Sequence, residues 1–161
     1  MRLLKLFALV ATLAAAVTIA GAARADDGPS WGPESPHFNL EAVLRATGDD
    51  GFGLVKFRQP NDGSKVIYLD TWVRDLLPNT TYYLRRAVDT SVDDNCTGSN
   101  WLTLGSITTD EGGTGRAALS RDVTLVPTGR EFDISFIIVD APTSTAPILA
   151  SGCYQYTVDG D

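Results

Sequence analysis

The chain has 161 residues, of which 43% are hydrophobic and 20% are charged, and its formal net charge is −7. This length is enough for one domain with a hydrophobic core and too short for two large ones. The acidic balance argues against nucleic acid and anionic membrane surfaces as partners, because both would repel the protein.

The first 25 residues have the composition of a secretory signal peptide. Arg2 and Lys5 precede an apolar run at 6–20, and the segment ends in the tripeptide Ala-Arg-Ala, which places small residues where signal peptidase cleaves. We expect cleavage after Ala25, a secreted or periplasmic location, and no stable membrane insertion afterwards. A retained membrane anchor is the alternative, but the run is short for a spanning helix, which needs about 20 strongly apolar residues.

Residues 26–38 are rich in proline and glycine, a composition that neither propagates a helix nor pairs well in a sheet. We interpret them as an extended N-terminal arm, which Trp31 and Phe38 would attach to the following domain; a flexible tail is the competing interpretation. His37 is the single histidine of the chain, and a zinc site needs several converging ligands. We therefore expect no metal and no cofactor.

Residues 39–161 are predicted to form one β-sandwich domain. Alternating segments rich in β-branched and aromatic residues favour strands, and clusters of Gly, Pro, Asn and Asp mark the turns between them. Eight such segments without a helical period indicate an all-β sandwich or barrel. The predicted strands are 40–46, 53–58, 66–73, 82–88, 101–108, 115–123, 132–139 and 148–158.

The stretch 65–88 contains two of these strands, joined at a corner. The alternate positions in 67–73 share an apolar face, and the Pro-Asn pair at 78–79 supplies the turn. Tyr82 follows at the place where sandwich proteins often use a tyrosine hydroxyl to bind upstream backbone; a core tyrosine with a solvated hydroxyl is the alternative. We expect Tyr82 and Trp72 in the core or in cross-strand pairs rather than on a sugar-binding platform.

The two cysteines suggest a disulfide bond. The acidic residues near Cys96 suggest a candidate calcium site. An even cysteine count in an exported chain predicts a disulfide; a buried pair of free thiols is the alternative. Oxygen-rich clusters bind calcium, but the spacing does not match an EF-hand, and a solvated acidic loop is the favoured interpretation. The predicted disulfide joins Cys96 and Cys153, and the candidate calcium ligands are Asp89, Asp93 and Asp94. The candidate binding residues for a protein or carbohydrate ligand are Trp101, Asn95 and Asn100.

Four segments follow one another along the chain: 43–45 before a glycine-aspartate turn, 53–59, the corner at 78–79, and 104–112. In this order they resemble the copper/zinc superoxide dismutase sandwich, a plan that related metal-free domains share. The resemblance covers roughly residues 40–158. It implies an eight-stranded antiparallel Greek-key β-sandwich, as in immunoglobulin-like and superoxide dismutase-like domains. It also implies a disulfide from the loop after the fourth strand to the last strand, as Cys96 and Cys153 would form.

The metal ligands of that family are missing from this sequence. Its histidines after the corner would fall near Leu84 and Arg86, its zinc aspartate near Thr103, and its late copper histidine near Asp140. Copper and zinc in such a site need imidazole ligands. The resemblance therefore implies a metal-free, divergent member of the superfamily without dismutase activity.

The remaining motifs do not indicate an enzyme. The sequence has no GxSxG context for an activated serine. We therefore expect an exported, non-catalytic β-sandwich domain that binds an unknown ligand or serves a structural role. The alternative is an enzyme, either a diverged metal-dependent dismutase-like protein or a carboxylate-based hydrolase. Two inward carboxylates in a deep cleft would favour the hydrolase.

Overall fold

The computed structural model describes residues 39–46, 48, 50–60 and 62–158. The predicted signal peptide, residues 1–25, and the predicted arm, residues 26–38 with Trp31, His37 and Phe38, lie outside the described residues. Within the described part of the chain every regular element is a β-strand. This part contains no helix long and apolar enough to cross a membrane. The all-β prediction is confirmed.

The described residues form nine strands, one more than predicted. The expected strand over 148–158 is divided in two, because Gly152 and Cys153 leave the ladder between its halves. The first half, β8, pairs with both β1 and β7, whereas the second half, β9, pairs with β7. The strands are β1 (Asn39–Ala46), β2 (Phe52–Arg58), β3 (Val66–Arg74), β4 (Thr81–Asp89), β5 (Leu102–Thr108), β6 (Gly115–Asp122), β7 (Glu131–Val139), β8 (Leu149–Ser151) and β9 (Tyr154–Thr157).

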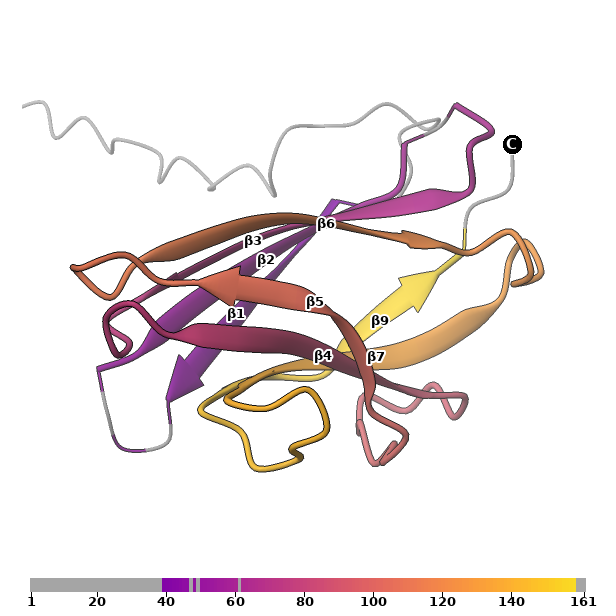
Figure 1. The fold of residues 1–161 in the computed structure, drawn as a ribbon. Coiled ribbons are helices and arrows are strands. Elements are labelled where there is room, and N and C mark those ends of the chain that lie inside the picture. Colours follow the sequence, from indigo (N-terminus) through magenta and orange to yellow (C-terminus); the bar gives the residue numbers. More distant parts are fainter. Residues whose placement is uncertain (1–38, 47, 49, 61, 159–161) are drawn as a thin grey trace, which may run out of the picture. The chain divides into compact units, whose positions relative to one another are not determined.

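All strands belong to one antiparallel sheet that folds over into a sandwich and nearly closes. The strand order is β5-β4-β7-β8-β1-β2-β3-β6, with β9 beside β7. Strands β1, β2, β3 and β6 form one layer, and β4, β5 and β7 form the facing layer (Figure 1). The two end strands, β5 and β6, meet at a bridge between Thr109 and Gly115. Elsewhere in the described residues no ladder joins them.

The corner between β3 and β4 has the predicted tyrosine. The Tyr82 side chain is only 2% exposed, and its hydroxyl oxygen accepts a hydrogen bond from the backbone N–H of Leu77 at 3.1 Å. Asn79 has a φ of 48°, the left-handed conformation that asparagine tolerates. The Thr109 hydroxyl donates to the carbonyl of Leu77 at 2.6 Å, which fastens the corner to the end of β5. The tyrosine-corner prediction is confirmed.

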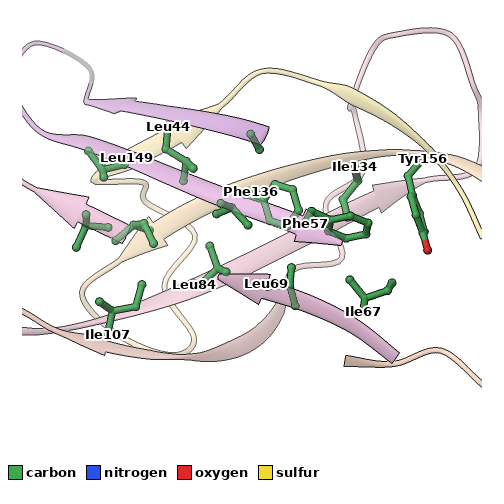
Figure 2. Close-up of a cluster of buried hydrophobic side chains, with 14 of the residues drawn as sticks. Leu44, Phe57, Ile67, Leu69, Leu84, Ile107, Ile134, Phe136, Leu149 and Tyr156 are labelled. Atoms are coloured by element: carbon green, nitrogen blue, oxygen red, sulfur yellow. The ribbon is translucent and has the colours of Figure 1, made fainter. Parts of the chain in front are cut away.

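The hydrophobic core lies between the two layers. The alternate residues of β3 predicted to face it, from Ile67 to Val73, are all buried. Figure 2 shows Leu44, Ile107 and Leu149 toward one end of the cluster and Ile67 and Ile134 toward the other. The two ends belong to the same pair of layers, and they differ in what fills them.

Trp72 lies on the outer face of β3, so the expectation that it belongs to the core is wrong. Its neighbours Thr71 and Val73 face inward, and strand side chains alternate between faces. Its ring makes an edge contact with Phe52 on β2, with centroids 5.7 Å apart. The guanidinium of Arg74 lies 5.7 Å from the centroid of its ring. Trp72 thus forms a cross-strand aromatic contact instead of a core contact.

Candidate functional site

An apolar cavity of about 230 Å³ lies between the layers. Ten of its lining side chains are apolar, and the other four are one threonine and three arginines. It occupies the half of the core around Phe57, Ile67 and Ile134, which we call the open end; the half around Leu44, Ile107 and Leu149 is the closed end (Figure 2). The lining residues are Phe57, Ile67, Leu69, Arg86, Val88, Thr90, Leu104, Arg121, Val123, Val126, Arg130, Phe132, Ile134 and Phe136.

The inward face of β4 explains why this half is hollow. Leu84 on this face is fully buried in the core, and the next inward residue is Arg86, which pairs in register with Phe136 of β7. A guanidinium group needs water or a partner, and an apolar side chain does not. Arg86 therefore occupies a core position without filling it as a leucine would.

Strand β6 repeats this arrangement in the other layer. Ala117 and Leu119 pack against the core, and two residues later the same face carries Arg121, in register with the buried Ile67. Val123, one further step along, is buried and lines the cavity. Each layer thus contributes one inward arginine to the cavity.

Arg86 and Arg121 stand at the mouth of the cavity. A second, outer hollow shares four lining residues with it, namely Arg86, Arg121, Val123 and Val126. The outer hollow is also lined by Leu125, whose side chain is 97% exposed. The two guanidinium groups therefore lie where the buried apolar space meets the surface.

Neither arginine of the mouth forms an ion pair with a carboxylate of the described residues. Burial lowers the pKa of Arg86 below its usual value, and the positive charge of Arg121 lowers it further. Arg86 nevertheless stays protonated, because arginine is not deprotonated in proteins. Among the described residues the ion pairs are Lys56 with Glu41, Arg58 with Asp70 and Arg74 with Asp75, and neither arginine of the mouth belongs to one of them.

Asp122 is the acidic residue adjacent to Arg121 in sequence. Its carboxylate accepts a hydrogen bond from the backbone N–H of Thr124 at 2.7 Å. Hydrogen bonding from the side chain of Thr124, and then from its backbone N–H, lowers the pKa of Asp122, and the charge of Arg121 contributes less. Asp122 lines the outer hollow and not the cavity. It therefore stabilises the turn after β6 rather than forming an ion pair with Arg121.

Arg85, the neighbour of Arg86, has a structural role on the opposite face of β4. It is only 7% exposed, and its guanidinium donates to the carbonyl of Trp101 at 2.6 Å and to the carbonyl of Ser144. It thus binds the two loops that cover the outer face of this layer. The two consecutive arginines differ because one finds backbone acceptors and the other faces the cavity.

The acidic loop uses its carboxylates for its own turns. Asp89 accepts hydrogen bonds from the Thr97 hydroxyl at 2.6 Å and from the Ser91 N–H at 3.1 Å, and the bond from Thr97 is the main cause of its lowered pKa. Asp93 accepts from the N–H of Asn95 at 3.1 Å. In the described part of the chain no group of three His, Cys, Asp or Glu side chains could hold a metal ion. Asp89 and Asp93 thus stabilise turns of their own loop, and together with the exposed Asp94 they do not form such a group.

The predicted binding residues of the same loop lie away from the cavity. Asn95 and Asn100 are exposed and Trp101 is half-buried, and none of the three lines the cavity. The loop is joined to the segment before β9 by the disulfide between Cys96 and Cys153, whose Cα atoms are 5.4 Å apart. The sequence analysis thus selected binding residues in a loop that the disulfide holds in place, and it missed the inward arginines Arg86 and Arg121.

The positions that match the dismutase ligands do not meet. Leu84 and Arg86 face the interior, whereas the Thr103 hydroxyl donates to the carbonyl of Pro142 at 2.5 Å and Asp140 is exposed. Thr103 is bound to a surface loop, so the set is divided between the two faces of one layer. These four residues do not form a site for a metal ion.

No pair of carboxylates faces the cavity either. Among the described residues that line it there is no aspartate or glutamate. Among the described residues Asp133 has a fully buried carboxylate, but it lies on the outward face of β7 and accepts a hydrogen bond from the N–H of Asp93 at 3.0 Å. The arrangement that would favour a carboxylate-based hydrolase is therefore not found at this cavity.

Comparison with protein-family models and with curated protein sequences finds no match. The fold and the site define the class of the protein: an antiparallel β-sandwich whose two layers enclose an apolar cavity. Two inward arginines at the mouth of that cavity, Arg86 and Arg121, are its most distinctive feature.

Proposed function

We propose that this protein is an exported, non-catalytic β-sandwich domain that binds a small apolar ligand between its layers. The observation that carries the proposal is the cavity of about 230 Å³ at the open end. Protein interiors are normally packed without such voids, because each one forfeits contacts. An apolar cavity of about 150 Å³ is known to bind benzene, so this one has room for a ring or a hydrocarbon chain.

The chemistry of the lining supports binding rather than catalysis. Ligand pockets are mainly apolar with a few placed polar groups, which describes this cavity. The polar groups that the described residues contribute to it are the Thr90 hydroxyl and three guanidinium groups, and these residues contribute neither a carboxylate nor an imidazole for proton transfer. A sugar would need many hydrogen-bonding partners, so an apolar ligand suits this lining better than a carbohydrate.

Two features support export to the periplasm or the medium. Residues 1–25 have the composition of a signal peptide, and disulfides persist in oxidising compartments. The bond from Cys96, after β4, to Cys153, before β9, also has the placement that the superoxide dismutase-like resemblance implies. We accordingly include a metal-free, divergent member of that superfamily in the proposal.

Titration with a neutral fluorescent apolar probe, phenylnaphthylamine, tests the proposal. The natural protein should bind it saturably, with one probe per chain. Val126→Trp places a large ring among the lining residues and should weaken binding at least about tenfold, since the ring competes for the same space. Unfolding curves establish that the variant is folded.

Leu77→Trp is the matched control, because it adds the same ring at an exposed position of the β3–β4 corner. It should bind the probe as the natural protein does. Unsaturable binding by the natural protein, or equal binding by a folded Val126→Trp protein, would overturn the proposal.

A further inference from the structure

The two arginines at the mouth come from opposite layers of the sandwich. Arg86 is on β4 and Arg121 is on β6, strands that do not pair with each other. Both line the inner cavity and the outer hollow, and the charge of Arg121 acts on Arg86. Two positive groups thus flank a single passage from the surface into an apolar space.

Arg121 is exposed to solvent, so the cost of this arrangement falls mainly on Arg86, and a bound anion would lower it. Two like charges repel each other, and the half-buried guanidinium of Arg86 has lost part of its hydration. The chain has 20 acidic residues, yet the ion pairs of the described residues involve other cations. Asp122 lines the outer hollow and interacts with the charge of Arg121, but among the described residues that line the inner cavity beside Arg86 there is no carboxylate.

The ligand can supply a negative charge and also fill the cavity. Guanidinium groups bind carboxylates through paired, charge-assisted hydrogen bonds. The cavity behind them is apolar and smaller than the 300–1,000 Å³ or so of pockets for drug-sized ligands, which favours one hydrocarbon chain over two. A single-chain carboxylate therefore matches the mouth with its head and the cavity with its tail.

We propose that the ligand is a single-chain fatty carboxylate, whose head is bound by Arg86 and Arg121 and whose chain enters the cavity. This inference rests on the proposed function, because it assigns the charge and shape of the ligand of the same cavity. Arg130 also lines the cavity and adds to the positive field. The Leu125 side chain beside the outer hollow offers apolar contact to the part of the chain near the head.

Competition against bound phenylnaphthylamine tests the inference, with decanoate and decanol as matched competitors. The natural protein should bind decanoate about 10- to 100-fold more tightly than decanol, as expected for hydrogen bonds to a charged group. In the Arg86→Gln/Arg121→Gln double variant this preference should disappear while decanol still binds. Added salt should reduce the preference of the natural protein, because the mouth is partly exposed.

Arg116→Gln is the control, since Arg116 is on β6 but on its exposed outer face. It should keep the preference for decanoate. If the natural protein binds the neutral probe but does not prefer decanoate, the inference is wrong and the proposed function stands. If the natural protein does not bind the neutral probe, the proposed function itself is wrong. A preference that survives in the double variant would also overturn the assignment to these arginines.

Discussion

The closed and open ends of the core are built from the same strands but differ in how completely their side chains pack. At the closed end β5 and β6 approach closely, because Gly115 leaves room for the side chain of Ile107. At the open end the same inward faces carry Arg86 and Arg121, and a cavity replaces the packing. One arginine on the inward face of β4 and one on the inward face of β6 thus distinguish the open half of the core, which has the cavity, from the packed, closed half.

The open end has a second source of stability outside the core. The disulfide joins the loop after β4 to the segment before β9, and β9 pairs with β7 over Glu131 to Ile134, the part of β7 that lines the cavity. Asp133 adds a buried hydrogen bond to the same loop. A covalent bond and loop contacts therefore support the half of the sandwich in which packing is incomplete.

The largest effect on stability is expected from removing the disulfide. Cys153→Ser should lower the free energy of unfolding by about 4 kcal/mol from loop-closure entropy alone, because the bond closes a loop with a sequence separation of 57. Urea unfolding measures the change. An unchanged unfolding curve, or two thiols that titrate in the native protein, would contradict it.

Truncating one side chain at each end compares their packing directly. Leu149→Ala at the closed end removes a fully buried side chain and should cost about 2–5 kcal/mol. Val126→Ala beside the cavity should cost under about 1 kcal/mol, since its neighbours on one side are already missing. Equal losses of unfolding free energy would mean that the two ends do not differ in packing.

The contact between Gly105 on β5 and Leu119 on β6 is expected to be sensitive to one added methyl group. A Cβ at Gly105 would lie 2.5 Å from Cδ2 of Leu119, so Gly105→Ala should cost about 1–3 kcal/mol through overpacking. The double variant with Leu119→Ala relieves this clash. A double-mutant cycle should therefore show a favourable coupling, and strictly additive losses would be the contradicting result.

The smallest expected change has the opposite sign. Arg86→Leu should raise the free energy of unfolding of the ligand-free protein by about 1 kcal/mol, because it fills an inward position with an apolar side chain. Arg116→Leu on the outer face should stay within about 0.5 kcal/mol of the natural protein. A destabilised, ligand-free Arg86→Leu protein would show that Arg86 supports the fold rather than binding.

Local chemistry made part of this structure predictable. The left-handed Asn79, the Tyr82 hydroxyl bond and the buried face of β3 each follow from neighbouring residues. The division of the last strand depends on where Cys153 meets Cys96, which is a tertiary contact. Periodicity was sufficient where a strand's own pattern determined its faces, and insufficient where distant segments met.

The cavity could not be predicted for the same reason. Arg86 and Arg121 lie on strands far apart in sequence, and only the folding of the sheet brings them to one passage. A signal existed on each strand, because an arginine follows inward apolar residues in the alternation, as in Leu84 and then Arg86. Such a break in an inward face is a useful pointer to a site when no histidine or cysteine motif is present.

The most direct test of ligand binding at the open end is methyl NMR during titration with decanoate. Isoleucine methyl signals report on both ends, since Ile67 and Ile134 line the cavity and Ile107 lies at the closed end. The signals of Ile67 and Ile134 should shift saturably, and that of Ile107 should remain in place. Shifts centred on Ile107, or no shift at a decanoate concentration that displaces the probe, would contradict binding in the cavity.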